Sequence, residues 1–271
     1  MIPFLIFSLL AAIPFEHSEW DRFLKKFVND KGEVNYSAAL QEPRLLNRYL
    51  TRLKRIPVKE LFHWPREERM AVFINAYNAG IVRSILDSYP VKTVMNIPGL
   101  WEQRTIPVGS SSGKKKKKKV FFYSLNQIEK EVLKMEFRDE KTLFALSKGA
   151  KSSPRLRQEA YTGPHLEGQL YLAAREFVND ARQVKIEPGK KKIHLSKLFK
   201  WHADDFLFNW GDFPEGNKWA PEETAVLSFV VHYLEDAKKV EYLKEGEYKV
   251  AYLDFDWRLN EWQEAADKTN S

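Results

Sequence analysis

The chain has 271 residues, of which 44% are hydrophobic and 30% charged, a composition typical of a soluble globular protein. The net charge of +7 comes from 44 basic and 37 acidic residues, but one run, Lys114 through Lys119, supplies six of the basic residues. Without that run the balance is 38 against 37, which argues against a basic face and a specific nucleic-acid partner. The absence of cysteine excludes disulfides, thiolate catalysis and cysteine metal sites.

Residues 1–15, MIPFLIFSLLAAIPF, form an apolar leader that is short for a membrane span. It is similar to the apolar part of a secretory signal, with Ala11 and Ala12 as small residues near a cleavage site, although no Lys or Arg precedes it. A buried strand or helix is the alternative. We expect an extracytoplasmic protein, periplasmic or secreted, and otherwise a cytoplasmic one. Residues 16–271 are expected to form a single domain.

The first half of the chain predicts helices. Apolar residues recur at helical spacing over residues 18–28 and 42–53. Residues 70–86, MAVFINAYNAGIVRSIL, are apolar on nearly all sides and predict a buried central helix. Asn75 and Asn78 interrupt this run three residues apart, so they share one helix face and need polar partners. They either bond backbone groups of neighbouring segments, which we favour, or line a polar site.

A hairpin is predicted from two short strands, residues 104–108 and 120–123. Its tip, residues 109–119 with the sequence GSSSGKKKKKK, is expected to be flexible and solvated. The lysines there could contact an anionic lipid, an anionic polymer or nucleic acid. A tolerated loop insertion is the interpretation that we favour.

A helix is predicted over residues 125–135, with Ser124 and Gln127 placed to form a capping box and Glu129 next to the inward-facing residues. Residues 147–161, SKGAKSSPRLRQEAY, follow as a small, polar and basic loop between apolar neighbours. A serine-rich turn that leads towards a helix can offer backbone N–H groups to an anion.

The second half of the chain predicts a mixture of helices and short strands. Helices are expected over residues 164–181 and 222–234, and strands over residues 184–186, 192–195 and 248–255. The whole chain therefore predicts an α+β fold, a helix-rich single domain with a small, mainly antiparallel sheet or hairpins.

Residues 199–210, FKWHADDFLFNW, carry the strongest titratable cluster. His202 and Asp205 lie three residues apart and meet on one helix face, where a carboxylate can orient a general base or a structural pair can link helices. A metal site built from His194, His202 and Asp204 has no supporting ligand spacing. We expect neither a metal nor another cofactor.

Several of these segments, taken in order, resemble the blocks of the DUF547 family, a domain of unknown function. The blocks are FINAYNAGIV at residues 73–82, Trp101, SLNQIE at 124–129, FAL at 144–146, Ser153-Pro154-x-Leu156, SxxFxWxxxDF at 196–206 and DWxLN at 256–260. They span residues 60–262 approximately, and the resemblance implies no established reaction.

Family members typically read H-F-A-L-x-C-x-S-x-S-C-P across the basic loop. The positions aligned with the His and the two Cys are Leu143, Lys148 and Ser153 in this chain. If the family performs thiol chemistry there, the resemblance implies that this chain has lost both the nucleophile and its partner.

We therefore favour a non-catalytic or degenerate DUF547-like protein that is exported and binds a small ligand or a protein partner. The binding pocket is predicted to be lined by five residues: Asn75, Asn78, Glu129, Arg155 and Asp205.

Two other functions stay open. A hydrolase or transferase would use Ser153 as nucleophile, His202 and Asp205 as base and orienter, and the backbone N–H groups of Ser152 and Ser153 as oxyanion donors. Alternatively, the lysine run from Lys114 to Lys119 would bind an anionic surface.

Overall fold

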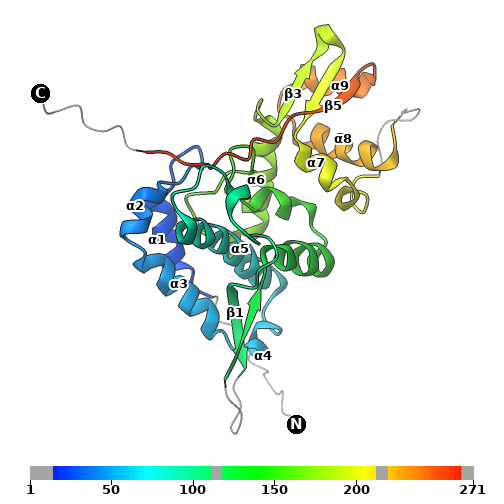
Figure 1. The fold of residues 1–271 in the computed structure, drawn as a ribbon. Helices are drawn as coiled ribbons and strands as arrows, with labels where there is room; N and C mark the ends of the chain where they lie inside the picture. The colour runs from blue at the N-terminus through cyan, green and yellow to red at the C-terminus, as the bar shows by residue number, and fades with distance from the viewer. Residues whose placement is uncertain (1–14, 112–117, 212–218, 264–271) are drawn as a thin grey trace, which may run out of the picture.

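One long helix, α5 (Arg66–Ser88), lies at the centre of the computed structural model, which describes residues 15–111, 118–211 and 219–263 (Figure 1). The predicted leader, apart from Phe15, and residues 112–117 of the predicted lysine-rich loop lie outside the described residues. The other α-helices are α1 (Ser18–Phe27), α2 (Tyr36–Gln41), α3 (Arg44–Arg55), α4 (Val58–Leu61), α6 (Leu166–Asn179), α7 (Lys197–Trp201), α8 (Pro221–Tyr233) and α9 (Ala237–Glu245).

The central helix is buried along nearly its whole length because its sequence is apolar all round. Its two amides bond backbone groups, as favoured from the sequence. Asn75 donates to the carbonyl of Tyr161 at 2.7 Å and accepts from the N–H of Tyr161 at 3.1 Å. Asn78 donates to the carbonyl of Ala145 and accepts from the N–H of Ser147, both at 2.9 Å. Both ends of the basic loop are thus fastened to α5.

The strands form two small sheets. Strands β1 (Ile106–Ser111) and β2 (Lys119–Tyr123) pair antiparallel and form the hairpin that the sequence predicts. Strand β4 (Lys192–Leu195) lies between β3 (Val184–Glu187), with which it is antiparallel, and β5 (Lys249–Tyr252), with which it is parallel. The predicted helix-rich α+β fold with mainly antiparallel strands is confirmed.

The core consists of two clusters that meet at the short 3-10 helix η3 (Glu140–Ala145). One cluster surrounds α5, and Ala145 belongs to it. The other is rich in phenylalanine, and its Phe144 ring contacts the rings of Phe177 and Phe229 at centroid distances of 5.0 and 5.2 Å. Adjacent residues of η3 therefore pack into different clusters, which fixes how the clusters meet. Other 3-10 segments are η1 (Val94–Asn96), η4 (Gly163–His165), η5 (Pro188–Lys190) and η6 (Ala203–Phe206).

The helix predicted over residues 125–135 is a π-helix, η2 (Gln127–Phe137). The predicted capping box is present, since Ser124 Oγ accepts from Gln127 N–H at 3.1 Å and Gln127 Oε1 accepts from Ser124 N–H at 3.3 Å. The buried residues of η2 are Ile128, Glu129, Leu133 and Phe137, so Glu129 lies on the buried side of the helix.

The last described segment returns from β5 across the molecule to the N-terminal helices (Figure 1). Single β-bridges join Arg258 to Thr93, Leu259 to Ala150 and Glu261 to Val34. The Asn260 side chain accepts from the Tyr36 hydroxyl at 2.7 Å and donates to the Gly32 carbonyl at 3.3 Å. This segment therefore ties together parts of the chain that are far apart in sequence. None of the helices in the described ranges is both long and apolar enough to cross a membrane.

Replacement of Asn78 by alanine should destabilise the protein by about 2–4 kcal/mol, because it leaves a buried carbonyl and a buried N–H without partners. Urea unfolding of Asn78→Ala measures this loss. The control, Asn47→Ala on α3, removes one exposed bond from Arg83 and should cost about 1 kcal/mol or less. Equal losses in the two variants would contradict the role of Asn78.

Candidate functional site

The residues proposed from the sequence lie in three different places. Asn75 and Asn78 are in the core, bonded to backbone. Glu129, His202 and Asp205 meet at a cavity between η2 and η6, hereafter the η2–η6 cavity. Ser153 and Arg155 line a separate pocket, hereafter the Arg155 pocket. The structure therefore does not gather the predicted binding residues into one site.

Glu129 is the centre of a buried network of charges. The ammonium of Lys148 lies 2.8 and 3.0 Å from the two carboxylate oxygens of Glu129, and both side chains are less than a tenth exposed. The Tyr77 hydroxyl also donates to Glu129, at 3.3 Å. Burial of either charge alone is costly, so each ion stabilises the other in this position.

His202 lies between two carboxylates. Its Nδ1 is 3.0 Å from Asp205 Oδ2, and its Nε2 is 3.3 Å from Glu129 Oε1. A carboxylate only accepts hydrogen bonds, so both ring nitrogens of His202 face acceptors within the protein. Neither ring nitrogen is therefore directed at a nucleophile. The predicted pairing of His202 with Asp205 is present, in a setting unfavourable for a general base.

The two carboxylates of this network stay ionised. Burial acts to raise the pKa of Glu129, but Lys148 and His202 together hold it below its ordinary value. Burial acts in the same direction on Asp205, and the hydrogen bonds from His202 and Lys134 hold the pKa of Asp205 below its ordinary value. Lys134 extends the network, because its ammonium bonds Asp205 and also Asp204, the latter at 2.8 Å.

The η2–η6 cavity lies beside this network and has a volume of about 310 Å³. Leu143 and Leu146 give it a buried apolar lining, and Met135 and Phe208 are exposed apolar residues of its wall. Lys130 is one of its exposed cations. The cavity thus offers apolar contact on one side and charge on the other.

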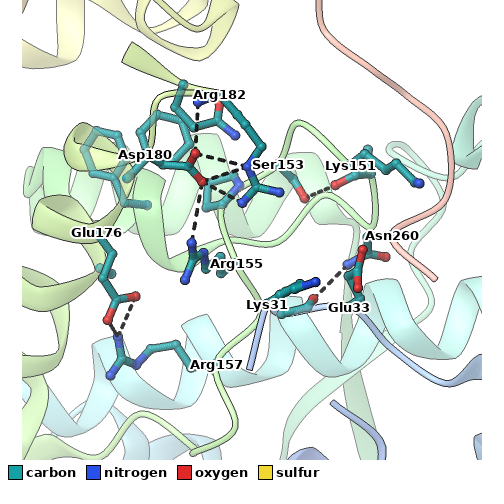
Figure 2. Close-up of a pocket in the computed structure, with 17 residues that line it drawn as sticks. Lys31, Glu33, Lys151, Ser153, Arg155, Arg157, Glu176, Asp180, Arg182 and Asn260 are labelled. Carbon is teal, nitrogen blue, oxygen red and sulfur yellow. Dashed lines mark hydrogen bonds and ion pairs between the residues drawn. The ribbon is translucent and has the colours of Figure 1, made fainter. Parts of the chain in front are cut away.

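Ser153 is part of a turn in the Arg155 pocket (Figure 2). His202 does not line this pocket. The Ser153 hydroxyl donates to the Ala150 carbonyl at 2.6 Å. The two cavities share no lining residue, so the pairing of Ser153 with His202 that the hydrolase hypothesis requires is absent from this structure.

The backbone of the serine turn is also occupied. The N–H of Ser152 donates to Asp256 and that of Ser153 donates to Ala150, at 3.2 and 3.1 Å. The N–H of Lys151 donates to the Arg258 carbonyl at 2.9 Å. These groups are therefore committed within the protein and are not directed at an anion.

Sequence reasoning missed two features of this region. The pairing of Lys148 with Glu129 was not predicted, although Glu129 falls in a family-like block and Lys148 aligns with the first family cysteine. Three tryptophans of those blocks also cluster, with Trp257 at centroid distances of 6.2 Å from Trp101 and 5.8 Å from Trp201. The shared blocks were the available signal, because residues of separate blocks meet here.

The candidate metal ligands are not brought together. His194 pairs with Glu187 at 3.2 Å, whereas His202 pairs with Glu129 and Asp205. Among the residues that the structure describes, no group of three or more His, Cys, Asp or Glu side chains is arranged to hold a metal ion.

Replacement of Lys148 by methionine should cost about 3–5 kcal/mol at neutral pH, because Glu129 then stays buried with its main counter-charge removed. In the wild type the pKa of Glu129 is lowered, so its stabilising effect is present above pH 4.5 and is lost as the pH falls further. In Lys148→Met burial should instead raise this pKa, so the deficit should shrink as the pH falls.

Urea unfolding of Lys148→Met at neutral and mildly acidic pH measures both effects. The matched control is Lys141→Met, which removes a more exposed pair with Asp139 and should cost about 1 kcal/mol or less. A deficit in Lys148→Met that stays constant with pH would show that Glu129 is not the group left unpaired.

Comparison with known proteins gives one match. The family model described as "Protein of unknown function, DUF547" matches residues 61–178. Neither the curated proteins nor the solved structures contain a match to this chain. The matched segment includes α5, Glu129 and Lys148, whereas His202 and Asp205 lie after its end. Over residues 61–178, less than half of its length, the chain is similar to the DUF547 family.

Proposed function

We propose that this protein binds a small ligand in the η2–η6 cavity without converting it. The observation that carries the proposal is the bond of Lys148 to both oxygens of Glu129, at 2.8 and 3.0 Å. By resemblance, Lys148 stands where family members have a cysteine. An ammonium held by a buried carboxylate is protonated and is a poor nucleophile.

The surroundings of Lys148 support a binding role. Leu143, which stands at the position of the family's histidine, lines the cavity with an apolar side chain. His202 is held between Glu129 and Asp205. The residues at the positions of the family's histidine and first cysteine are therefore replaced, and His202 is committed to the charge network.

The lining of the η2–η6 cavity favours a ligand that is apolar at one end and anionic at the other. Leu143 and Leu146 would contact the apolar part. Lys130 and Arg138 line the cavity with exposed cationic side chains that have no ion-pair partner among the described residues. Five carboxylates also line the cavity, against three basic side chains, but each already has a partner. Glu129 bonds Lys148, Asp204 and Asp205 bond Lys134, Asp139 bonds Lys141, and Glu140 accepts from the side chains of Asn209 and Trp210.

The dye 8-anilinonaphthalene-1-sulfonate combines apolar rings with an anionic group, so it should bind the wild type saturably at one site. Phe208→Ser should weaken this binding by about fivefold to tenfold, because loss of a mostly exposed ring removes ligand contact with little effect on the core. Fluorescence titration measures the affinity, and thermal unfolding checks that the variant is folded.

The matched control is Phe62→Ser, since Phe62 is 63% exposed and Phe208 74% exposed, but Phe62 does not line the cavity. The control should bind the dye as the wild type does. Unchanged binding in Phe208→Ser, or an equal loss in Phe62→Ser, would place the dye elsewhere and contradict the proposal.

Ser153→Ala separates this proposal from the hydrolase hypothesis. Because Ser153 bonds Ala150 and has no contact with His202, the variant should release 4-nitrophenol from 4-nitrophenyl acetate at the wild-type rate. The release is followed by absorbance. The wild-type protein should release 4-nitrophenol no faster than the non-enzymatic background, which is measured with the unfolded chain or with free amines. A wild-type rate clearly above that background and lost in Ser153→Ala would establish serine catalysis.

A further inference from the structure

Three separate segments of the chain supply most of the lining of the Arg155 pocket, to which Phe144 and Asn260 also contribute (Figure 2). The segments are the turn at Lys31–Glu33, the basic loop that carries Arg155, and the chain from Glu176 at the end of α6 to Gln183. Its volume is about 150 Å³, and it is separate from the η2–η6 cavity. Phe144 and Phe177 contribute apolar surface to its lining.

The pocket has an excess of positive charge. Its basic lining residues are Lys31, Lys151, Arg155, Arg157 and Arg182. Its acidic lining residues are Glu33, Glu176 and Asp180. Five positive against three negative charges leave a formal charge of +2. This excess is local, because the net charge of the chain outside the lysine run is close to zero.

Arg155 is an arginine of this pocket with hydrogen-bonding capacity to spare. Arg182 holds Asp180 through several short bonds, the closest at 2.6 Å. Arg155 contacts the same carboxylate only once, at 3.6 Å, which is beyond hydrogen-bond distance. Burial acts to raise the pKa of Asp180, but the guanidinium groups of Arg182 and Arg155 outweigh it and hold that pKa below its ordinary value. The carboxylate thus orients Arg155 while its N–H donors stay available.

The position of Arg155 is set by close packing against Gly32. Gly32 has a φ of +78°, and a Cβ placed on it would lie 2.8 Å from Arg155 Cβ. The Gly32 carbonyl also accepts from Asn260 at 3.3 Å. The turn that carries Lys31 is therefore held directly against the backbone of Arg155, which places both residues at the same pocket.

We propose that the Arg155 pocket binds the dianionic phosphate group of a small molecule. A planar guanidinium with free donors, supported by a second cation, is suited to phosphate oxygens. The local charge of +2 matches a dianion better than a single carboxylate. The Lys151 side chain extends away from Arg155 in Figure 2, so it contributes charge rather than a direct contact. Phe144 and Phe177 would contact an organic group attached to the phosphate.

Isothermal titration calorimetry of the full chain at low salt tests this proposal with inorganic phosphate, glycerol 3-phosphate and succinate as probes. Both phosphates should bind saturably at one site, and succinate should bind at least about tenfold more weakly. Tighter binding of glycerol 3-phosphate than of inorganic phosphate would identify a phosphate ester as the ligand, and the reverse order would identify free phosphate. Either order supports a phosphate site.

Arg155→Gln should weaken phosphate binding by about tenfold or more, since it removes a charge-assisted contact but keeps the Cβ that packs on Gly32. The control, Arg175→Gln on α6, removes an arginine that pairs with Glu235 outside the pocket and should leave the affinity unchanged. Thermal unfolding checks that both variants fold. The proposal would be overturned if neither phosphate gave saturable binding, if succinate bound more tightly than the phosphates, or if Arg155→Gln left the phosphate affinity unchanged.

Discussion

The need to satisfy two amides on a fully buried helix governs the arrangement of this protein. Asn75 and Asn78 bond backbone at Tyr161, Ala145 and Ser147, so they hold both ends of the basic loop against α5. That loop carries Lys148 towards Glu129 and Arg155 towards the opposite pocket. The two amides line neither cavity, yet the geometry of both cavities depends on them.

The charge network shows how a lysine is accommodated in the core at a position where the family pattern has a cysteine. A buried carboxylate such as Glu129 needs a compensating charge, and Lys148 supplies one at a position where the family resemblance expects a thiol. His202 joins the same carboxylate from a segment beyond the region that the family model matches. A lysine at position 148 therefore neutralises the buried Glu129 carboxylate. The neighbouring cavity has an apolar lining of Leu143 and Leu146.

Local sequence patterns predicted the central helix, the hairpin of β1 and β2, the strands β3 and β4 and the capping box at Ser124, because each depends on residues that are close in the chain. The π-helical form of η2 was not predictable, since it depends on what packs against its buried face. The pairing of His202 with Asp205 has helical spacing and was predicted, whereas its contact with Glu129 joins residues 73 positions apart and needed the fold. For the same reason the sequence could not predict that Ser153 and His202 line different cavities.

The return of the C-terminal segment has a consequence for the order of events during synthesis. Val34 pairs with Glu261, and Tyr36 bonds Asn260, so the turn after α1 completes its contacts only when the end of the chain has been made. On the ribosome, the first helices therefore emerge long before the partners that cover them. The same turn contains Gly32, so the wall of the Arg155 pocket that it forms is among the last parts of the native structure to be secured.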